Sequence, residues 1–410
     1  MLRWGYMANT KKLSRSLSLP LVALYGLGNI LGAGIYVLVG KVAGEAGYST
    51  VLAFVLAMVI AGLTAFSYME LSGRYPVSAS VSVYLHKAFG RKWLSVGIGL
   101  AMVAAGITSA ATLAKGFAGY LSVLLPTPEL LAGIGLLVVL GLVAAKGIGE
   151  SAKLAGIFTF VEVAGLALVI TAGRNSFSTI DTSKLLSIDP AVGLSGLIGG
   201  AFLAFYAFIG FEDMVNIAEE TKNPQRTMPL AILISLMVST VLYILVATVA
   251  ITAVNPVVLA NSKAPLSLVY SQARGGSAWF LTIIGISAAV NGVIVQIIMG
   301  SRILYGLSRQ GWLDKRLAEV NKDTKTPVVA TALIVCLMIL SAFLLPLVSL
   351  ARLTSLIVLG IFALVNLALV VIKRRGDKHN GFITVPIAIP YLGAISSVFV
   401  ILYELRHMLL

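Results

Sequence analysis

Long, unbroken runs of apolar residues recur along the whole of this chain. A helix needs about 20 predominantly apolar residues to cross the hydrocarbon core of a bilayer, and about eleven such stretches lie between the charged clusters. Their approximate limits are 19–42, 51–71, 94–125, 130–145, 154–172, 191–217, 230–254, 279–304, 328–347, 350–372 and 383–402. A membrane barrel strand would instead show about ten residues of alternating polarity. The pattern therefore predicts an all-α polytopic membrane protein with about eleven transmembrane helices.

The composition agrees with a chain whose main solvent is lipid. Of the 410 residues, 59% are hydrophobic and only 11% are charged, whereas about a quarter of the residues in a soluble domain are charged. The longest polar connections, at 309–325 and 173–189, are each shorter than about 20 residues, so no separate soluble domain is predicted. The stretch from residue 19 is too long for a secretory leader and is predicted to be a retained first helix.

The formal net charge of +14 does not indicate a nucleic-acid partner, because the basic residues are distributed by membrane topology rather than gathered on one segment. Most Lys and Arg residues fall in alternate connections, at 3–15, 74–92, 146–153, 222–226, 302–325 and 373–378. The other connections hold only Lys41, Arg174, Lys184, Lys263, Arg274, Arg352 and Arg406. The positive-inside rule then predicts a cell membrane protein with a cytoplasmic N-terminus and an external C-terminus.

The sequence shows no pattern typical of a metal site or of an enzyme active site. The chain has one cysteine, Cys336, within an apolar stretch, and three widely spaced histidines, which form no recognisable metal-ligand set. The spans contain no cluster of a nucleophile and a base, and no repeat that would form a ring-like ion filter. We therefore predict neither an enzyme nor a channel, and no cofactor beyond a coupling H⁺ or Na⁺.

The first apolar stretch contains a glycine-rich segment, Gly-Leu-Gly-Asn-Ile-Leu-Gly-Ala-Gly-Ile at 26–35. Such a helix unwinds easily, and backbone freed at bilayer depth must be satisfied by protein, water or a ligand. Close helix packing is an alternative explanation for the same glycines. A dinucleotide-binding loop is excluded, because no strand precedes the glycines and spanning sequence follows them.

The sixth apolar stretch carries a matching irregularity. The segment 205–213 reads Phe-Tyr-Ala-Phe-Ile-Gly-Phe-Glu-Asp, so a glycine is followed at once by two carboxylates inside a hydrophobic span. Charges at that depth are costly and indicate a functional site. Interruptions at corresponding positions of two halves indicate a transporter built from an inverted repeat. The chain thus divides into an N-terminal segment, 1–18, two five-helix repeats, 19–172 and 191–372, and an extra helix at 383–405.

Three sequence blocks resemble the amino acid, polyamine and organocation permease family. The first is Gly-Ala-Gly-Ile-Tyr at 32–36, which is similar to the family's glycine-x-glycine-isoleucine-aromatic break. The second runs from Phe208 through Glu-Glu-Thr-Lys-Asn-Pro-Gln-Arg at 219–226 to Pro229, and is similar to the sixth helix and the loop after it. The third is Arg-Ile-Leu-Tyr-Gly-Leu-Ser-Arg-Gln-Gly at 302–311, with Pro327 opening the next helix. The segment at 76–84 departs from the paired glycines and tyrosine that family members often have there.

The resemblance implies a five-plus-five inverted-repeat fold with discontinuous helices 1 and 6. Amides freed in the first break would suit a substrate carboxylate, and carbonyls freed in the second would suit an ammonium group. The implied substrate-binding residues are Ile30, Gly32, Ala33, Gly34, Ile35, Phe205, Tyr206, Ala207, Ile209 and Gly210. Either Tyr206 or Phe205 would act as an aromatic gate. Glu212 matches a position linked to gating or proton sensing, and its structural alternative is to cap freed backbone amides.

Glu162 lies near the middle of the fifth stretch, about 12 Å along a helix from Leu154. Many proton-coupled members of the family have a lysine at the aligned position, judged from the segment at 147–153, so this chain departs from the pattern. We expect ion coupling through Glu162, while an ion pair with Lys115 and a hydrogen bond to an amide remain alternatives.

These features together predict a secondary active permease for amino acids or related organic amines that works by alternating access. The apolar and aromatic residues of the expected pocket favour neutral amino acids, although Glu212 leaves cationic ones open. Proton coupling is the first expectation, and an amino acid or polyamine exchanger of the same fold is the alternative.

Overall fold

The computed structural model describes residues 15–77, 80–146, 152–175, 185–376 and 383–409. Within these residues the backbone is helical apart from loops and one isolated bridge between Leu17 and Thr221. The long helices are α1 (Leu19–Ala46), α2 (Thr50–Arg74), α4 (Lys92–Leu124), α5 (Glu129–Ala145), α6 (Ala152–Ala172), α9 (Gly193–Phe205), α10 (Pro224–Ala253), α13 (Trp279–Arg309), α14 (Val328–Leu344), α15 (Leu347–Arg374) and α16 (Ala388–Leu409). The shorter elements are η1 (Gly47–Ser49), α3 (Ser80–Phe89), η2 (Tyr206–Phe208), η3 (Phe211–Glu220), α11 (Pro256–Asn261), α12 (Pro265–Arg274) and η4 (Lys315–Ala318).

These helices account for all the predicted apolar stretches. Seven helical segments of the described chain are long and apolar enough to cross a membrane, and one of them, Leu19–Arg74, contains both α1 and α2. Three shorter apolar helices, Glu129–Ala145, Gly156–Ala172 and Val328–Leu344, occupy the remaining stretches. The predicted all-α polytopic class is confirmed.

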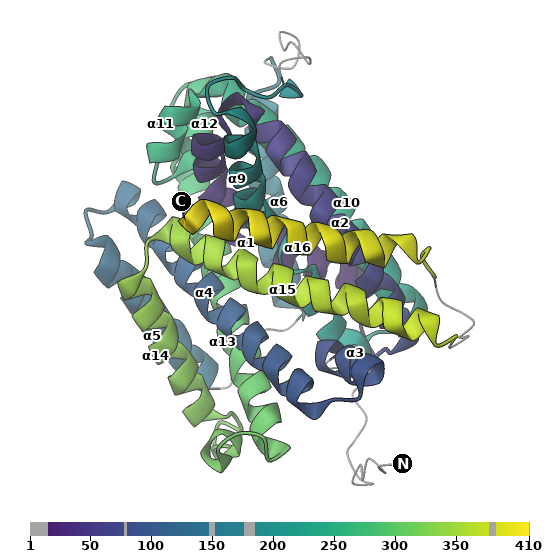
Figure 1. Ribbon diagram of the computed structural model, residues 1–410. Helices are drawn as coiled ribbons and strands as arrows, with labels where there is room; N and C mark the ends of the chain where they lie inside the picture. Colours follow the sequence, from purple (N-terminus) through teal and green to yellow (C-terminus); the bar gives the residue numbers. More distant parts are fainter. Residues whose placement is uncertain (1–14, 78–79, 147–151, 176–184, 377–382, 410) are drawn as a thin grey trace.

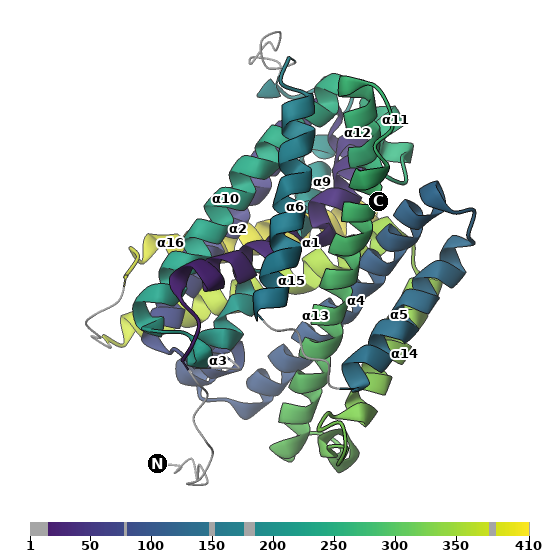
Figure 2. The ribbon, with the colours of Figure 1, turned by 180° about the vertical axis from the view of Figure 1, so that it is seen from behind.

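The broken segments occupy the centre of the bundle, and unbroken helices surround them. Helix α1 packs against α10, α9, α6 and α13, while α4 packs along both α13 and α15. Figures 1 and 2 show α15 and α16 side by side on one side of α1, and α6 and α10 on the other. Helices α5 and α14 form an outer pair beside α4.

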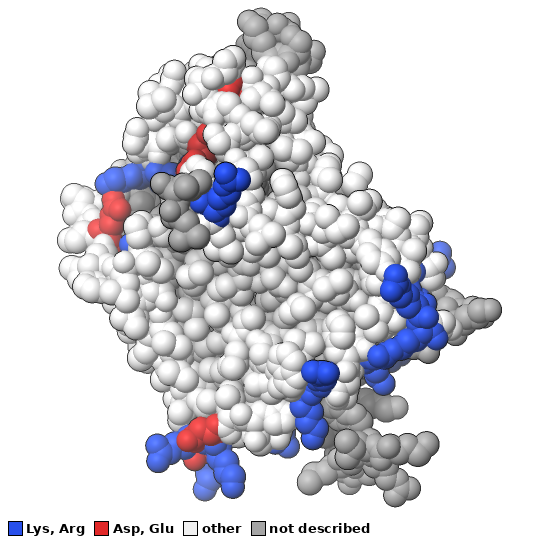
Figure 3. All heavy atoms as spheres, in the orientation of Figure 1, with Lys and Arg blue, Asp and Glu red and all other residues white. Residues whose placement is uncertain are grey.

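Polar contacts join segments that the sequence places on the same side of the membrane. On the side predicted to be internal, Arg375 donates to the carbonyl of Lys87 (3.0 Å), and Thr326 donates to that of Ala145 (2.5 Å). On the other side, Lys263 pairs with Glu129 at 2.5 Å. Between these levels, Figure 3 shows a broad face without charged residues across the middle of the molecule. This distribution fits a protein surrounded by lipid.

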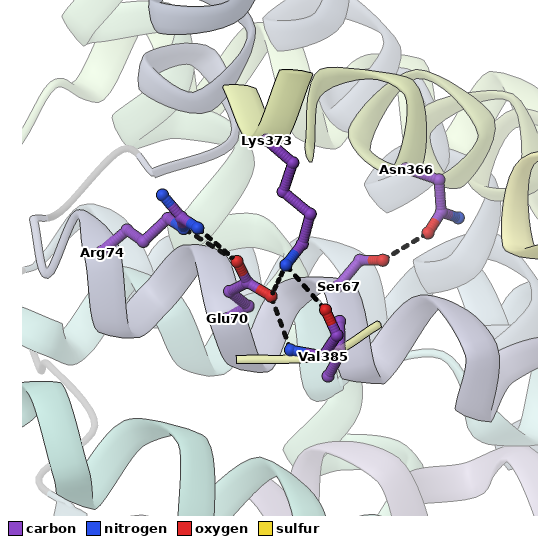
Figure 4. Close-up of polar contacts among 6 residues, drawn as sticks. All are labelled: Ser67, Glu70, Arg74, Asn366, Lys373 and Val385. Atoms are coloured by element: carbon purple, nitrogen blue, oxygen red, sulfur yellow. Dashed lines mark hydrogen bonds and ion pairs between the residues drawn. The ribbon is translucent and has the colours of Figure 1, made fainter. Parts of the chain in front are cut away.

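A buried charge cluster joins α2, α15 and the segment before α16. The carboxylate of Glu70, which is fully buried, accepts from Arg74 (2.6 Å), from Lys373 (2.7 Å) and from the backbone amide of Val385 (2.7 Å). Figure 4 shows these groups converging from α2, from α15 and from the segment that contains Val385. Beside them Asn366 accepts from Ser67 (2.6 Å) and donates to Thr64 (2.8 Å). We call Glu70, Arg74, Lys373 and Asn366, with their partners, the α2–α15 cluster.

A second set of ion pairs lies at the opposite end of α15. Arg352 pairs with Glu45 of α1 at 2.6 Å and with Glu404 of α16 at 2.7 Å. Helix α15 is thus fixed by ion pairs near both of its ends.

Candidate functional site

Helix α1 is interrupted in the middle of the bundle. Its regular dihedral angles fail at Gly32, where φ is 18° and ψ is −151°, and the helix then resumes to Ala46. Glycine, which lacks a Cβ atom, adopts such a backbone conformation more readily than other residues. The glycine-rich segment therefore forms a break, as the sequence analysis predicted.

The sixth span is broken more completely. Helix α9 ends at Phe205 and passes through the short η2 into Ile209, which is extended, and Gly210, whose φ is +131°. The chain then resumes as η3 from Phe211. Together with Gly32, this confirms the two predicted discontinuous spans.

The two breaks lie against each other at their glycines. A Cβ atom at Gly210 would collide with the carbonyl group of Asn29, and one at Gly34 would lie 2.8 Å from the Cα of Ala207. A real Cβ atom does not approach backbone this closely. Both positions therefore need glycine for the break in α1 to contact the break between α9 and η3.

The half-helices on each side of the breaks also pair. The segment before α1 bonds to the end of η3, because the Leu17 amide donates to the Glu220 carbonyl (3.0 Å) and the Lys222 amide donates back to that of Leu17 (2.9 Å). The second half of α1 packs on α9, where a Cβ at Gly200 would lie 2.6 Å from that of Ala46. Each half of α1 is thus joined to one half of the sixth span.

Tyr243 of α10 connects the two breaks. Its hydroxyl oxygen lies 2.7 Å from the carbonyl oxygen of Ile30 and 2.8 Å from that of Ala207, so a single hydroxyl donor serves both freed carbonyls. The ring is fully buried and meets Phe208 edge-on, with 5.1 Å between the ring centroids. Tyr243 therefore satisfies backbone that the breaks leave without helical partners.

A cavity with an empty volume of about 500 Å³, which we call the main cavity, opens where the breaks meet. Its walls come from α1, from the break of the sixth span, and from α4 and α13 on the opposite side. The residues that line it are Gly28, Asn29, Ile30, Gly32, Gly34, Ser109, Leu113, Tyr206, Ile209, Gly210, Asp213, Asn291, Gly292, Val295 and Gln296. This lining combines polar groups with apolar side chains, as ligand sites in proteins do.

A second cavity of about 380 Å³ shares four of these residues, Ser109, Ile209, Asp213 and Gln296. It is also lined by Glu212 and by Thr354, Val358 and Ile361 of α15. The shared residues form the boundary between the two cavities.

Comparison with known proteins assigns this architecture to a family. The family model described as "Amino acid permease" matches residues 17–404. The chain belongs to the amino acid permease family. Family members are membrane transporters rather than enzymes.

Three relatives illustrate the range of the family around this permease. It is 30% identical to the branched-chain amino acid permease BcaP of Bacillus subtilis (strain 168), over 96% of this chain and 88% of that protein. It is 32% identical to the mitochondrial cationic amino acid transporter 3 of Arabidopsis thaliana, over 88% of this chain but only 63% of that longer protein. It is 27% identical to a methylthioribose transporter of Bacillus subtilis (strain 168), over 95% of this chain and 88% of that protein.

Six of the ten predicted substrate-binding residues line the main cavity of the permease, namely Ile30, Gly32, Gly34, Tyr206, Ile209 and Gly210. The others lie nearby in different surroundings. Ile35 is fully buried in the core, Phe205 packs on Phe362 with 5.6 Å between centroids, and Ala207 contacts Gly34. The side chain of Ala33 lies outside the described part of the structure.

Carbonyls near Tyr206, Ala207 and Ile209 were expected to receive an ammonium group, and those of Tyr206 and Ala207 already have one partner each. The Tyr206 carbonyl accepts from the amide of Ile209 (3.2 Å), and the Ala207 carbonyl accepts from Tyr243. A carbonyl oxygen has two lone pairs, so each can accept one further donor.

Glu212 takes the capping position that was the alternative to a role in gating. One carboxylate oxygen accepts from the backbone amide of Gly210 at 2.8 Å, at the start of η3. The residue is nearly fully buried and also lines the second cavity. Glu212 therefore stabilises the break in the sixth span and also lines the second cavity.

Glu162 is fully buried on α6 and is not among the residues that line either cavity. Its backbone carbonyl accepts from the hydroxyl of Tyr36 at 2.6 Å, and the Tyr36 carbonyl accepts from Tyr120 at 2.8 Å. The ion pairs seen among the described residues do not include Lys115 with Glu162. The aligned segment at 147–151 lies outside the described residues.

Several cavity residues were absent from the sequence prediction. Ser109 and Tyr206 share a hydrogen bond of 2.9 Å between their hydroxyls, which fixes the Tyr206 ring across the cavity. Asn29, Asp213, Asn291 and Gln296 also line the space. The sequence signal for these residues is the occurrence of polar side chains inside spans, which is the same signal that indicates Glu162 and Glu212.

Proposed function

We propose that this permease carries a neutral amino acid across the cell membrane by alternating access, coupled to protons. The observation that supports the proposal is the cavity where the two helix breaks meet, since it combines main-chain polar groups with an apolar lining. Amides that follow Gly32 face a substrate carboxylate, and carbonyls between Tyr206 and Ile209 face its ammonium group. Ile30, Leu113 and Val295 contact the rest of the substrate.

The pairing of half-helices supports alternating access. Leu17 and η3 are bonded together at one end, and Ala46 and α9 pack together at the other. Because Gly32 and Gly210 interrupt the helical backbone between these pairs, each pair can rotate as a unit while the other stays in place. The two five-helix repeats, 19–172 and 191–372, would then supply one broken helix each.

For coupling we propose Glu162 as the proton-binding group. It is a fully buried carboxylate on α6, and its backbone carbonyl is bonded through Tyr36 to α1 just beyond the break. Loss or gain of a proton by such a carboxylate changes the stability of the conformational state in which the carboxylate is buried. Glu212 acts as a second titrating group because it caps the other break and lines the second cavity.

The direct test is uptake of radiolabelled neutral amino acids by proteoliposomes that contain the purified permease. An inward proton gradient should drive accumulation in empty vesicles, and Glu162→Gln should abolish the response to the gradient while substrate still exchanges. Uptake that requires preloaded amino acid in the wild type would establish an exchanger instead. A response to a sodium gradient alone would exclude proton coupling.

We further propose that the N-terminus is cytoplasmic and the C-terminus external. Single cysteines placed in a Cys336→Ala background test this with an impermeant maleimide on intact cells. Ser277→Cys, between α12 and α13, should react from outside, and Asp323→Cys, after η4, only after lysis. The reverse pattern would invert the topology.

A further inference from the structure

Three carboxamide side chains around the main cavity have buried polar atoms without hydrogen-bond partners among the described residues. They are the Nδ2 atom of Asn29, the Oδ1 atom of Asn291 and the Oε1 atom of Gln296. Asn291 is only 5% exposed. A buried polar atom without a partner is costly, and native proteins retain few of them without a role.

Two of these side chains form one wall of the cavity. Asn291 and Gln296 both belong to α13, which faces the two breaks from the far side and packs along α4. Space for the Gln296 amide is provided by Gly106 of α4, where a Cβ would lie 2.8 Å from Oε1. The polar side chain that α4 contributes to the lining of this cavity is already engaged, because the hydroxyl of Ser109 bonds to Tyr206.

The position of this wall indicates which part of a ligand it meets. The main-chain groups that suit a zwitterion belong to α1 and to the break between α9 and η3. An amino acid held there by its carboxylate and ammonium directs its side chain away from the breaks, toward α4 and α13. The unsatisfied amides of α13 therefore lie where the end of a substrate side chain would reach.

We propose that Asn291 and Gln296 form a side-chain subsite that selects neutral amino acids bearing a hydroxyl or a carboxamide over aliphatic ones of the same shape. This inference rests on the proposed function and specifies its substrate class. A carboxamide presents both a donor and an acceptor, so two of them can bond a hydroxyl or another carboxamide in either direction. An aliphatic side chain would leave both amides unsatisfied, and a site built from polar groups rejects such an analogue strongly.

Isosteric pairs of amino acids test the subsite. Threonine matches valine, and asparagine matches leucine, in shape but not in hydrogen-bonding capacity. Binding to the purified full-length permease is measured by thermal shift over a range of concentrations, with alanine as a ligand that has no group to reach α13. We expect threonine and asparagine to bind at least about tenfold more tightly than valine and leucine.

The variants Asn291→Leu and Gln296→Met should reduce these ratios toward one while still binding alanine. Retained binding of alanine shows that each variant is folded with an intact zwitterion site. Gln272→Met, which makes the same exchange at an exposed position of α12, is the matched control and should keep the wild-type ratios.

Two results would overturn the subsite. The first is equal or tighter binding of valine and leucine by the wild type, and the second is a preference for threonine that survives both substitutions. If the cavity simply holds water beside these amides, one of these two results is expected. If alanine and every other amino acid fail to bind, the proposed function fails with the subsite, whereas binding with an aliphatic preference removes the subsite alone.

Discussion

The α2–α15 cluster and the main cavity both place polar groups deep in an apolar protein, but they differ in how completely those groups are bonded. In the cluster, Glu70 accepts from two cations and one backbone amide, and both amide atoms of Asn366 have partners. At the cavity, one atom of each of Asn29, Asn291 and Gln296 has none among the described residues. Burial and polarity alone thus do not distinguish a structural group from one available to a ligand, whereas complete hydrogen bonding does.

The largest effect on stability should come from breaking the cluster. Glu70→Gln leaves Arg74 and Lys373 without their counter-charge in the interior, which costs about 3–5 kcal/mol. The melting temperature in detergent should fall, while the affinity of any remaining folded protein for substrate should not change. Glu129→Gln is the control, because its pair with Lys263 is about half exposed and is worth at most about 1 kcal/mol. Equal melting temperatures for the two variants would contradict the structural role of the cluster.

Gly210→Ala should impair substrate binding and transport more than it lowers the stability of the fold. Alanine at φ +131° is strained by about 1–3 kcal/mol, and its Cβ would push the break away from Asn29. Substrate binding and transport should be lost in protein that still purifies as a folded species. Gly360→Ala, on α15 with open space around it, should be neutral or stabilising by up to about 1 kcal/mol. Normal transport by Gly210→Ala would show that the contact between the breaks is dispensable.

Tyr243→Phe removes the hydroxyl that both breaks share. The carbonyls of Ile30 and Ala207 would lose a common donor in a buried setting, at a cost of about 1–3 kcal/mol. We expect weaker substrate binding together with a modest fall in melting temperature. Wild-type affinity in this variant would mean that the two breaks keep their shape without Tyr243.

The smallest stability change should occur at the cavity amides. Asn291→Leu removes an oxygen that has no partner among the described residues, so the free energy of unfolding should change by less than about 1 kcal/mol. The same exchange at Asn366 removes bonds to Ser67, Thr64 and the Phe362 carbonyl, and should cost about 2–3 kcal/mol. Chemical unfolding of both variants, followed by circular dichroism, checks the difference. Similar losses at the two sites would remove the distinction between cluster and cavity.

The sequence predicted the spans and both breaks because each depends on local composition. Hydropathy located the helices, and Gly32 and Gly210 marked the points where helical backbone fails. Partners distant in sequence were not predictable in the same way. Tyr243 lies in an uninterrupted apolar helix, and nothing in that pattern indicates that its hydroxyl reaches two carbonyls in other spans.

Charged residues show the same limit. Arg74 and Lys373 were assigned only to the basic loops of one side, yet the fold brings both onto Glu70, which a local pattern cannot anticipate. For Glu162, the sequence offered Lys115 as an ionic partner, and the described ion pairs do not contain this contact. The sequence indicates which charged residues lie within apolar spans, whereas the residues that they contact depend on how the helices pack.

Substrate protection at the cavity tests most directly whether the ligand binds where the two broken helices meet. In a Cys336→Ala background, Val295→Cys places a thiol in the cavity lining, and Asp323→Cys places one in an exposed loop. The rate of modification by a small thiol reagent is measured with and without an amino acid at 100 times its Kd, which leaves about 1% of the sites empty. Bound ligand should slow modification at position 295 by at least tenfold and leave position 323 unaffected. Equal rates at position 295 with and without bound amino acid would place the binding site elsewhere.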